Sequence, residues 1–96
     1  MIIRIKSKAG DFAENKDIAK QIREDIILPS IENGKKIYLD FDGVSGATQS
    51  FVHALISEAI RRIGDEVYEL IIFKNCNEQI RQIIIIVAEY MQESSS

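Results

Sequence analysis

Apolar residues in this chain form short continuous runs that alternate with longer stripes of helical spacing. The runs predict three strands, which lie at Ile2 to Ile5, at Lys36 to Phe41 and at Leu70 to Lys74. Polar residues from Ser7 to Asp11 predict a loop after the first strand, and Asn33-Gly34 predicts a turn before the second. The second run is almost continuously apolar, which is typical of a strand covered on both faces of a parallel sheet.

Three stripes of apolar residues predict helices that follow the three strands. The first carries Ile18, Ala19, Ile22 and Ile26 and is expected to end at Pro29. Its N-cap is Asp11, in a capping box with Glu14, or else Asn15 or Asp17.

The second helix is predicted from about Gln49 to Ile63, with Thr48 as its N-cap and Gly64 after its last turn. The third is expected to start after Asn75 or Asn77 and to continue to about Gln92.

This order of elements, β-α-β-α-β-α, predicts an α/β fold with a small, mostly parallel sheet. The loops that follow parallel strands emerge at one edge of the sheet, where ligands and partners usually bind. Here these loops are 7–11, 42–48 and 75–77. Functional residues are therefore expected in these loops.

Length and composition narrow the class of protein. The 96 residues predict a single domain, 1–96, with a disordered tail at 93–96. A net charge of −3 and scattered Lys and Arg residues argue against a nucleic-acid partner. The one cysteine allows no internal disulfide, which is typical of a cytoplasmic protein. The longest apolar run, Ile83 to Ala88, is far shorter than the roughly 20 residues of a membrane span, so we expect no membrane association.

Polar residues in the loops have structural interpretations that compete with chemical ones. Asp40 and Asp42 can share a face as metal ligands or acid–base groups, but we expect them to accept backbone N–H bonds that fix a turn. No metal or other cofactor is expected, because a chain with one histidine and one cysteine cannot build a dense zinc site. His53 is expected in solvent. Cys76 is near a helix start, which can lower the pKa of a thiol.

The stretches LDFDGVSGATQSFVHALI and IIFKNCNEQIRQII resemble the STAS-like family of bacterial proteins known as a domain of unknown function, DUF4325. The similarity covers roughly residues 36–91. It is carried by eight residues, which are Asp40, Phe41, Gly43, Val44, Ser50, Phe51, Asn75 and Asn77. The resemblance implies a STAS-like fold and no particular activity.

More remotely, the same stretch resembles the STAS domains of anti-sigma-factor antagonists. There a partner kinase phosphorylates a serine at the helix start, and the charge switches partner binding. The matching position here is Gln49, which cannot be phosphorylated, whereas Ser50 matches the following serine and Thr48 the preceding aspartate. The resemblance thus implies an ATP-binding kinase or ATPase-like partner and a phosphosite shifted to Ser50 or Thr48. The competing interpretation of both hydroxyls is helix capping.

From these observations we expect a non-catalytic, regulatory module that docks a protein partner through residues 42–51. The candidate residues are Asp42, Ser45, Thr48, Gln49 and Ser50. The alternative function is a sensor that binds a small ligand or nucleotide at the same edge. An enzyme ranks third, because no set of base, nucleophile and orienting group can be assembled.

Two further residues concern the oligomeric state. Ile85 and Ile86 fall beside or outside the apolar stripe of the last helix. They either pack under the first helix or form the interface of a homodimer, the commonest symmetric assembly.

Overall fold

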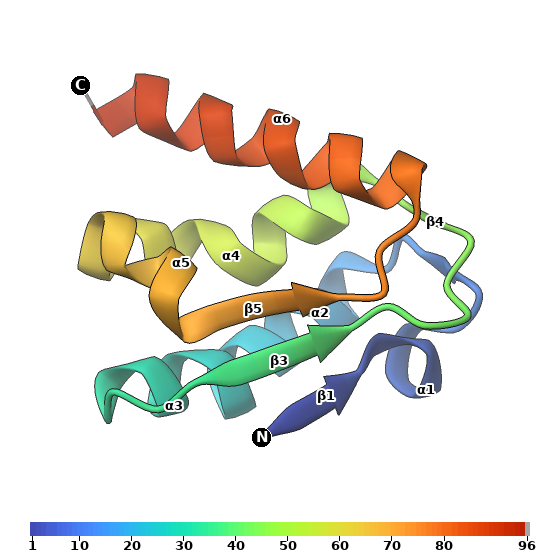
Figure 1. Cartoon of the computed structure of the whole chain (residues 1–96), viewed down its shortest axis with the longest axis horizontal. Coiled ribbons are helices and arrows are strands. Elements are labelled where there is room, and N and C mark those ends of the chain that lie inside the picture. The colour runs from blue at the N-terminus through green and yellow to red at the C-terminus, as the bar shows by residue number, and fades with distance from the viewer. Residues whose placement is uncertain (96) are drawn as a thin grey trace.

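A three-stranded parallel sheet forms the base of the molecule (Figure 1). The computed structural model describes the backbone of residues 1–95 and the side chains of residues 1–92. The strands are β1 (Ile2–Arg4), β3 (Ile37–Asp40) and β5 (Ile71–Lys74), in the order β1-β3-β5. The prediction of an α/β fold with a parallel sheet is therefore confirmed.

A second, two-stranded parallel sheet was not predicted. It pairs β2 (Phe12–Ala13) with β4 (Gly46–Ala47), and Phe12 lies opposite Gly46. Strands of two residues are too short to show the alternation of apolar and polar positions from which strands are recognised. This small sheet joins the loop after β1 to the loop after β3.

The first long helical segment begins where Asn15 caps it, one of the three expected positions. The Asn15 side chain accepts hydrogen bonds from the backbone N–H groups of Asp17 and Ile18. The segment comprises α2 (Lys16–Ile22), a π-helical turn over 23–27 and α3 (Leu28–Glu32).

The prediction that Pro29 ends this segment is wrong, because Pro29 lies in the first turn of α3. The Leu28 N–H donates to the carbonyl of Arg23, five residues back, so the turn before Pro29 is wide. A wide turn accommodates the proline ring, which would clash in a regular α-helix.

Two short helices occupy segments that the sequence did not mark as helical. The first is α1 (Ile5–Ala9), which replaces most of the predicted loop at 7–11. The second is α5 (Val67–Leu70), which follows a 3₁₀ turn over 64–66 and leads directly into β5. Both have fewer than six residues, so neither shows a helical stripe.

The two long helices match their predictions closely. α4 (Gln49–Ile63) starts at the Thr48 cap and ends at Gly64, which has a φ of 62°. α6 (Glu78–Ser95) follows Asn77, whose side chain accepts a hydrogen bond from the Ile80 N–H. α6 continues beyond Gln92, so part of the tail expected to be disordered is helical, while Ser96 lies outside the described residues.

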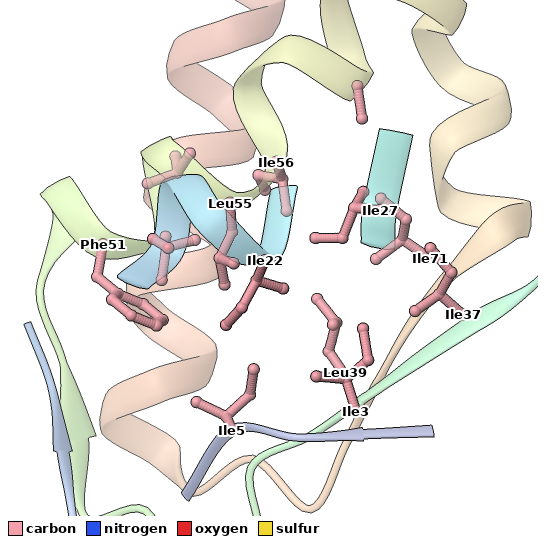
Figure 2. Packing of buried hydrophobic residues seen from close by; sticks show 14 of the residues in the cluster. Ile3, Ile5, Ile22, Ile27, Ile37, Leu39, Phe51, Leu55, Ile56 and Ile71 are labelled. Atoms are coloured by element: carbon pink, nitrogen blue, oxygen red, sulfur yellow. The ribbon is translucent and has the colours of Figure 1, made fainter. Parts of the chain in front are cut away.

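The core lies between one face of the sheet and the helices α2 and α4 (Figure 2). Ile3 and Leu39 point from the strands toward Ile22 and Leu55 of these helices. The expectation of cover on both faces is wrong, since burial alternates along β3 and the Ile2 side chain on the opposite face is 57% exposed. α6 packs along α4, on the side of α4 that faces away from the three-stranded sheet (Figure 1).

Candidate functional site

The loops after β3 and β5 meet at the carboxyl edge of the sheet, as the parallel order predicted. Asp40, the last residue of β3, joins them. Its Oδ1 accepts hydrogen bonds from the Asp42 N–H and from the Asn75 side-chain amide, each at 2.9 Å. Asn75 has a φ of 58°, a left-handed conformation that asparagine tolerates well. The prediction that a carboxylate fixes this turn is confirmed for Asp40.

The environment of Asp40 favours its ionised form. The hydrogen bond from Asn75 has the largest effect and, with the N–H of Asp42, lowers the pKa of Asp40 below its usual 3.8. Arg4 and Lys74, its neighbours in the sheet register, lower the pKa further. Asp40 is therefore a structural carboxylate rather than a proton donor near neutral pH.

Ser45, a predicted site residue, is held on both sides by other loops. Its backbone N–H and its hydroxyl both donate to the carbonyl of Asp11, at 2.7 and 2.9 Å. Its own carbonyl accepts a hydrogen bond of 2.8 Å from the Asn77 side chain. The Ser45 hydroxyl thus serves to fix the loop.

Gln79 makes the contact that sequence analysis missed most clearly. Its side-chain amide pairs with both backbone groups of Ala47: Oε1 accepts from the N–H at 3.0 Å, and Nε2 donates to the carbonyl at 3.1 Å. Gly46 leaves the space for this amide, because a Cβ there would lie 3.1 Å from Gln79 Oε1 and 2.8 Å from the Phe12 ring. We call this pair of hydrogen bonds the Gln79 clamp; it fastens the start of α6 to β4.

Thr48 is a helix cap, which is one of the two roles predicted for it. Its Oγ1 accepts a hydrogen bond of 3.1 Å from the Phe51 N–H, and its own N–H donates to Ala13. Phe51, the first apolar residue of the α4 stripe, is fully buried. The Thr48 cap and the buried Phe51 side chain together fix the first turn of α4.

Gln49 and Ser50 are the two predicted residues that point outward. Both are exposed, and Ser50 makes no side-chain hydrogen bond with the described residues. They line one end of a groove of about 540 Å³ between α2, α4 and α6, which we call the α4 groove. Asp42 instead lines a separate hollow of about 410 Å³ with Arg4, Lys6 and Ser7. The five candidate residues therefore do not converge on one point.

Four other residues differ from at least one expectation. His53 is half-buried and lies edge-on to Tyr90, with ring centroids 6.2 Å apart, so it is not simply solvated. Burial raises the pKa of the Cys76 thiol, the opposite of the predicted lowering. Ile85 and Ile86 are 48% and 43% exposed, which contradicts packing under the first helix.

Within the part of the chain that is described, no three His, Cys, Asp or Glu side chains are grouped so that they could hold a metal ion. Over the same residues, no helix combines the length and apolar character needed to span a bilayer.

Comparison with known proteins identifies a family. The model of a family described as a STAS-like domain of unknown function (DUF4325) matches residues 19–81, more than half of the chain. The predicted relationship is thereby confirmed. No curated protein and no solved structure matches this chain.

Replacing Asn75 tests the electrostatics of this edge. Asn75→Gly keeps the left-handed backbone conformation but removes the amide donor, so the pKa of Asp40 should rise toward its usual value, as measured by NMR titration of the carboxyl carbon. Because the pKa of Asp40 is lower in the folded than in the unfolded chain, the ionised carboxylate stabilises the fold above about pH 4. That contribution is lost as pH falls through the folded-state pKa.

Asn33→Gly is the matched control, since its amide donates to the Pro29 carbonyl and not to a carboxylate. It should leave the pKa of Asp40 unchanged. Equal Asp40 titration curves for Asn75→Gly and the original chain would show that the Asn75 amide does not stabilise the ionised form.

Proposed function

Because the chain belongs to the family of STAS-like domains of unknown function, we propose that it is a regulatory, non-catalytic module that docks a protein partner through residues 42–51. The observation that carries this proposal is that Gln49 and Ser50 are exposed to solvent on a fixed part of the backbone. Both are exposed at the end of a loop fixed by Ser45, by the Thr48 cap and by the Gln79 clamp. A rigid loop with exposed side chains loses little conformational entropy when a partner binds.

The same geometry favours Ser50 over Thr48 as the regulatory hydroxyl. Thr48 Oγ1 accepts the capping hydrogen bond, so a phosphate there would disturb the helix start. Ser50 lies in the first turn of α4, where the helix dipole tolerates an anion. The proposed partner is an ATP-binding kinase or ATPase-like regulator in the cytoplasm, which would transfer the γ-phosphoryl group of ATP to Ser50 Oγ and release ADP.

A non-catalytic role is supported by what the polar groups of this edge already do. The Asp40 carboxylate accepts two hydrogen bonds that fix the loops. The pKa of the Cys76 thiol is raised, so Cys76 is a weak nucleophile near neutral pH. The alternative function, a sensor of a small ligand or nucleotide, is favoured by one observation. The volume of the α4 groove is within the range of small-molecule sites.

We also propose that a homodimer forms through α6. Ile85 and Ile86 are both large and about half exposed, and a second copy would cover them. The double variant Ile85→Glu, Ile86→Glu should then shift the protein toward monomer in sedimentation while keeping its helical content. An original chain that sediments as a monomer at high micromolar concentration would contradict this proposal.

Substitution of Ser50 tests the regulatory role. Ser50→Asp should leave the free energy of unfolding within about 0.5 kcal/mol, as is usual for exposed sites. It should weaken binding of the isolated partner more than tenfold, or by about 1.4 kcal/mol, because a charge buried against a partner is costly unless it is paired.

Ser50→Ala is the control, since it removes the hydroxyl without adding charge and should keep partner binding. Thr48→Asp should keep the fold, because aspartate is a good N-cap. A Ser50→Asp chain that folds normally and binds its partner undiminished would eliminate Ser50 as the switch.

A further inference from the structure

The α4 groove has two unlike walls and a polar floor. Lys16 of α2 and Arg23 of the π-helical turn after it line one side, and Ile86 and Tyr90 of α6 line the other. The floor is a stripe of α4 that includes Gln49, His53, Ser57 and Arg61, spaced four residues apart. At a rise of 1.5 Å per residue, this stripe is about 18 Å long.

Ser57 in this floor is a buried polar residue. Its side chain is only 3% exposed and makes no hydrogen bond with the described residues. No fully buried side-chain N or O atom among those residues lacks a partner, so the Ser57 hydroxyl must keep its opening to the groove. Water can reach this hydroxyl through the groove, so a ligand that displaces the water must replace its hydrogen bond.

The charges of the groove are of one sign. Among the described residues that line it, Lys16, Arg23 and Arg61 are cations and none is a carboxylate, although the whole chain has a net charge of −3.

Two glutamates adjoin these cations. Arg23 is held by Glu24 at 2.9 Å and by the Ala54 carbonyl, whereas Arg61 contacts Glu58 only at 3.3 Å and stays 57% exposed. Exposed ion pairs of this kind are weak, so Arg61 can exchange Glu58 for a carboxylate of a ligand.

The opposite wall offers apolar surface to the same ligand. In the monomer, Ile86 is 43% exposed and Tyr90 is 60% exposed, so a ligand in the groove would compete with the proposed homodimer for Ile86. A ligand that fills the groove would therefore need acidic groups facing α2 and apolar groups facing α6. Its length of about 18 Å matches a helix of about twelve residues better than a compact small molecule.

We propose that the α4 groove binds an acidic amphipathic helix of the partner protein, in the way that an apolar helix face commonly lies in a groove. This inference rests on the proposed docking function and adds the chemistry of the partner. It also gives the Ser50 switch a physical cause. Phosphorylation of Ser50 would place close to two negative charges at one end of the groove, where they would repel the acidic helix.

The probe for this proposal is a synthetic peptide of 14 residues with glutamates along one helix face and leucines along the other. A second peptide, with lysine in place of every glutamate, controls for apolar binding. Experiments run at a concentration at which the protein sediments as a monomer. The acidic peptide should bind at least tenfold more tightly than the lysine peptide, less tightly as salt is added, and should shift the amide NMR signals of His53, Ser57 and Ile86.

Charge reversal in the groove locates the contact. Arg61→Glu and, as a second variant, Lys16→Glu should each weaken the acidic peptide about tenfold. Lys35→Glu, which changes the net charge equally in a turn away from the groove, should have no effect, and circular dichroism should show all three variants folded.

Each of three results would overturn the proposal: equal affinity for both peptides, no binding at millimolar peptide, or signal shifts outside the groove. If partner binding is lost in Ser50→Asp but unchanged in Arg61→Glu, the docking proposal stands and the groove proposal is wrong. If the acidic peptide binds in the groove but Ser50→Asp leaves partner binding intact, the proposed Ser50 switch fails alone and the groove proposal stands.

Discussion

The Gln79 clamp is the interaction on which the arrangement of this molecule depends. One side-chain amide satisfies the N–H and the carbonyl of Ala47, as a neighbouring strand would, and so closes the free edge of β4. The clamp connects residues 32 positions apart and fixes the start of α6 on the loop after β3. Because α6 continues from that point along α4, the clamp also sets the position of one wall of the α4 groove (Figure 1).

The predicted site residues near the clamp are of two kinds: some hold the loop by hydrogen bonds, and others are exposed to solvent. Ser45 and Thr48 use their hydroxyls in hydrogen bonds that hold the loop and cap α4. Gln49 and Ser50, which follow directly, remain exposed at the end of the groove. A small hydroxyl residue where a strand turns into a helix can thus be a cap or a surface residue, and here adjacent positions take the two roles.

The sequence was a good guide wherever the signal was local. The stripe of α4, its cap at Thr48 and the parallel order of the strands follow from spacing and composition, and all are present. The prediction that the helix ends at Pro29 was wrong because a wide π-helical turn before Pro29 lets the helix continue. No local pattern in the sequence indicates such a turn. Gln79 could not be found because a side-chain amide becomes a strand partner only when folding brings Ala47 to it. The groove depends likewise on three helices that meet in space, so spacing along the chain did not reveal it.

Hydrogen exchange of the Ala47 amide in Gln79→Ala tests the central role of the clamp most directly. Gln82→Ala is the matched control, because Gln82 bonds only to the exposed Glu78 on the same helix. Loss of the clamp leaves both backbone groups of the buried Ala47 unpaired, so the amide should exchange at least tenfold faster, while the Thr48 amide, bonded to Ala13, changes less. Equal protection of Ala47 in Gln79→Ala and Gln82→Ala would contradict the account.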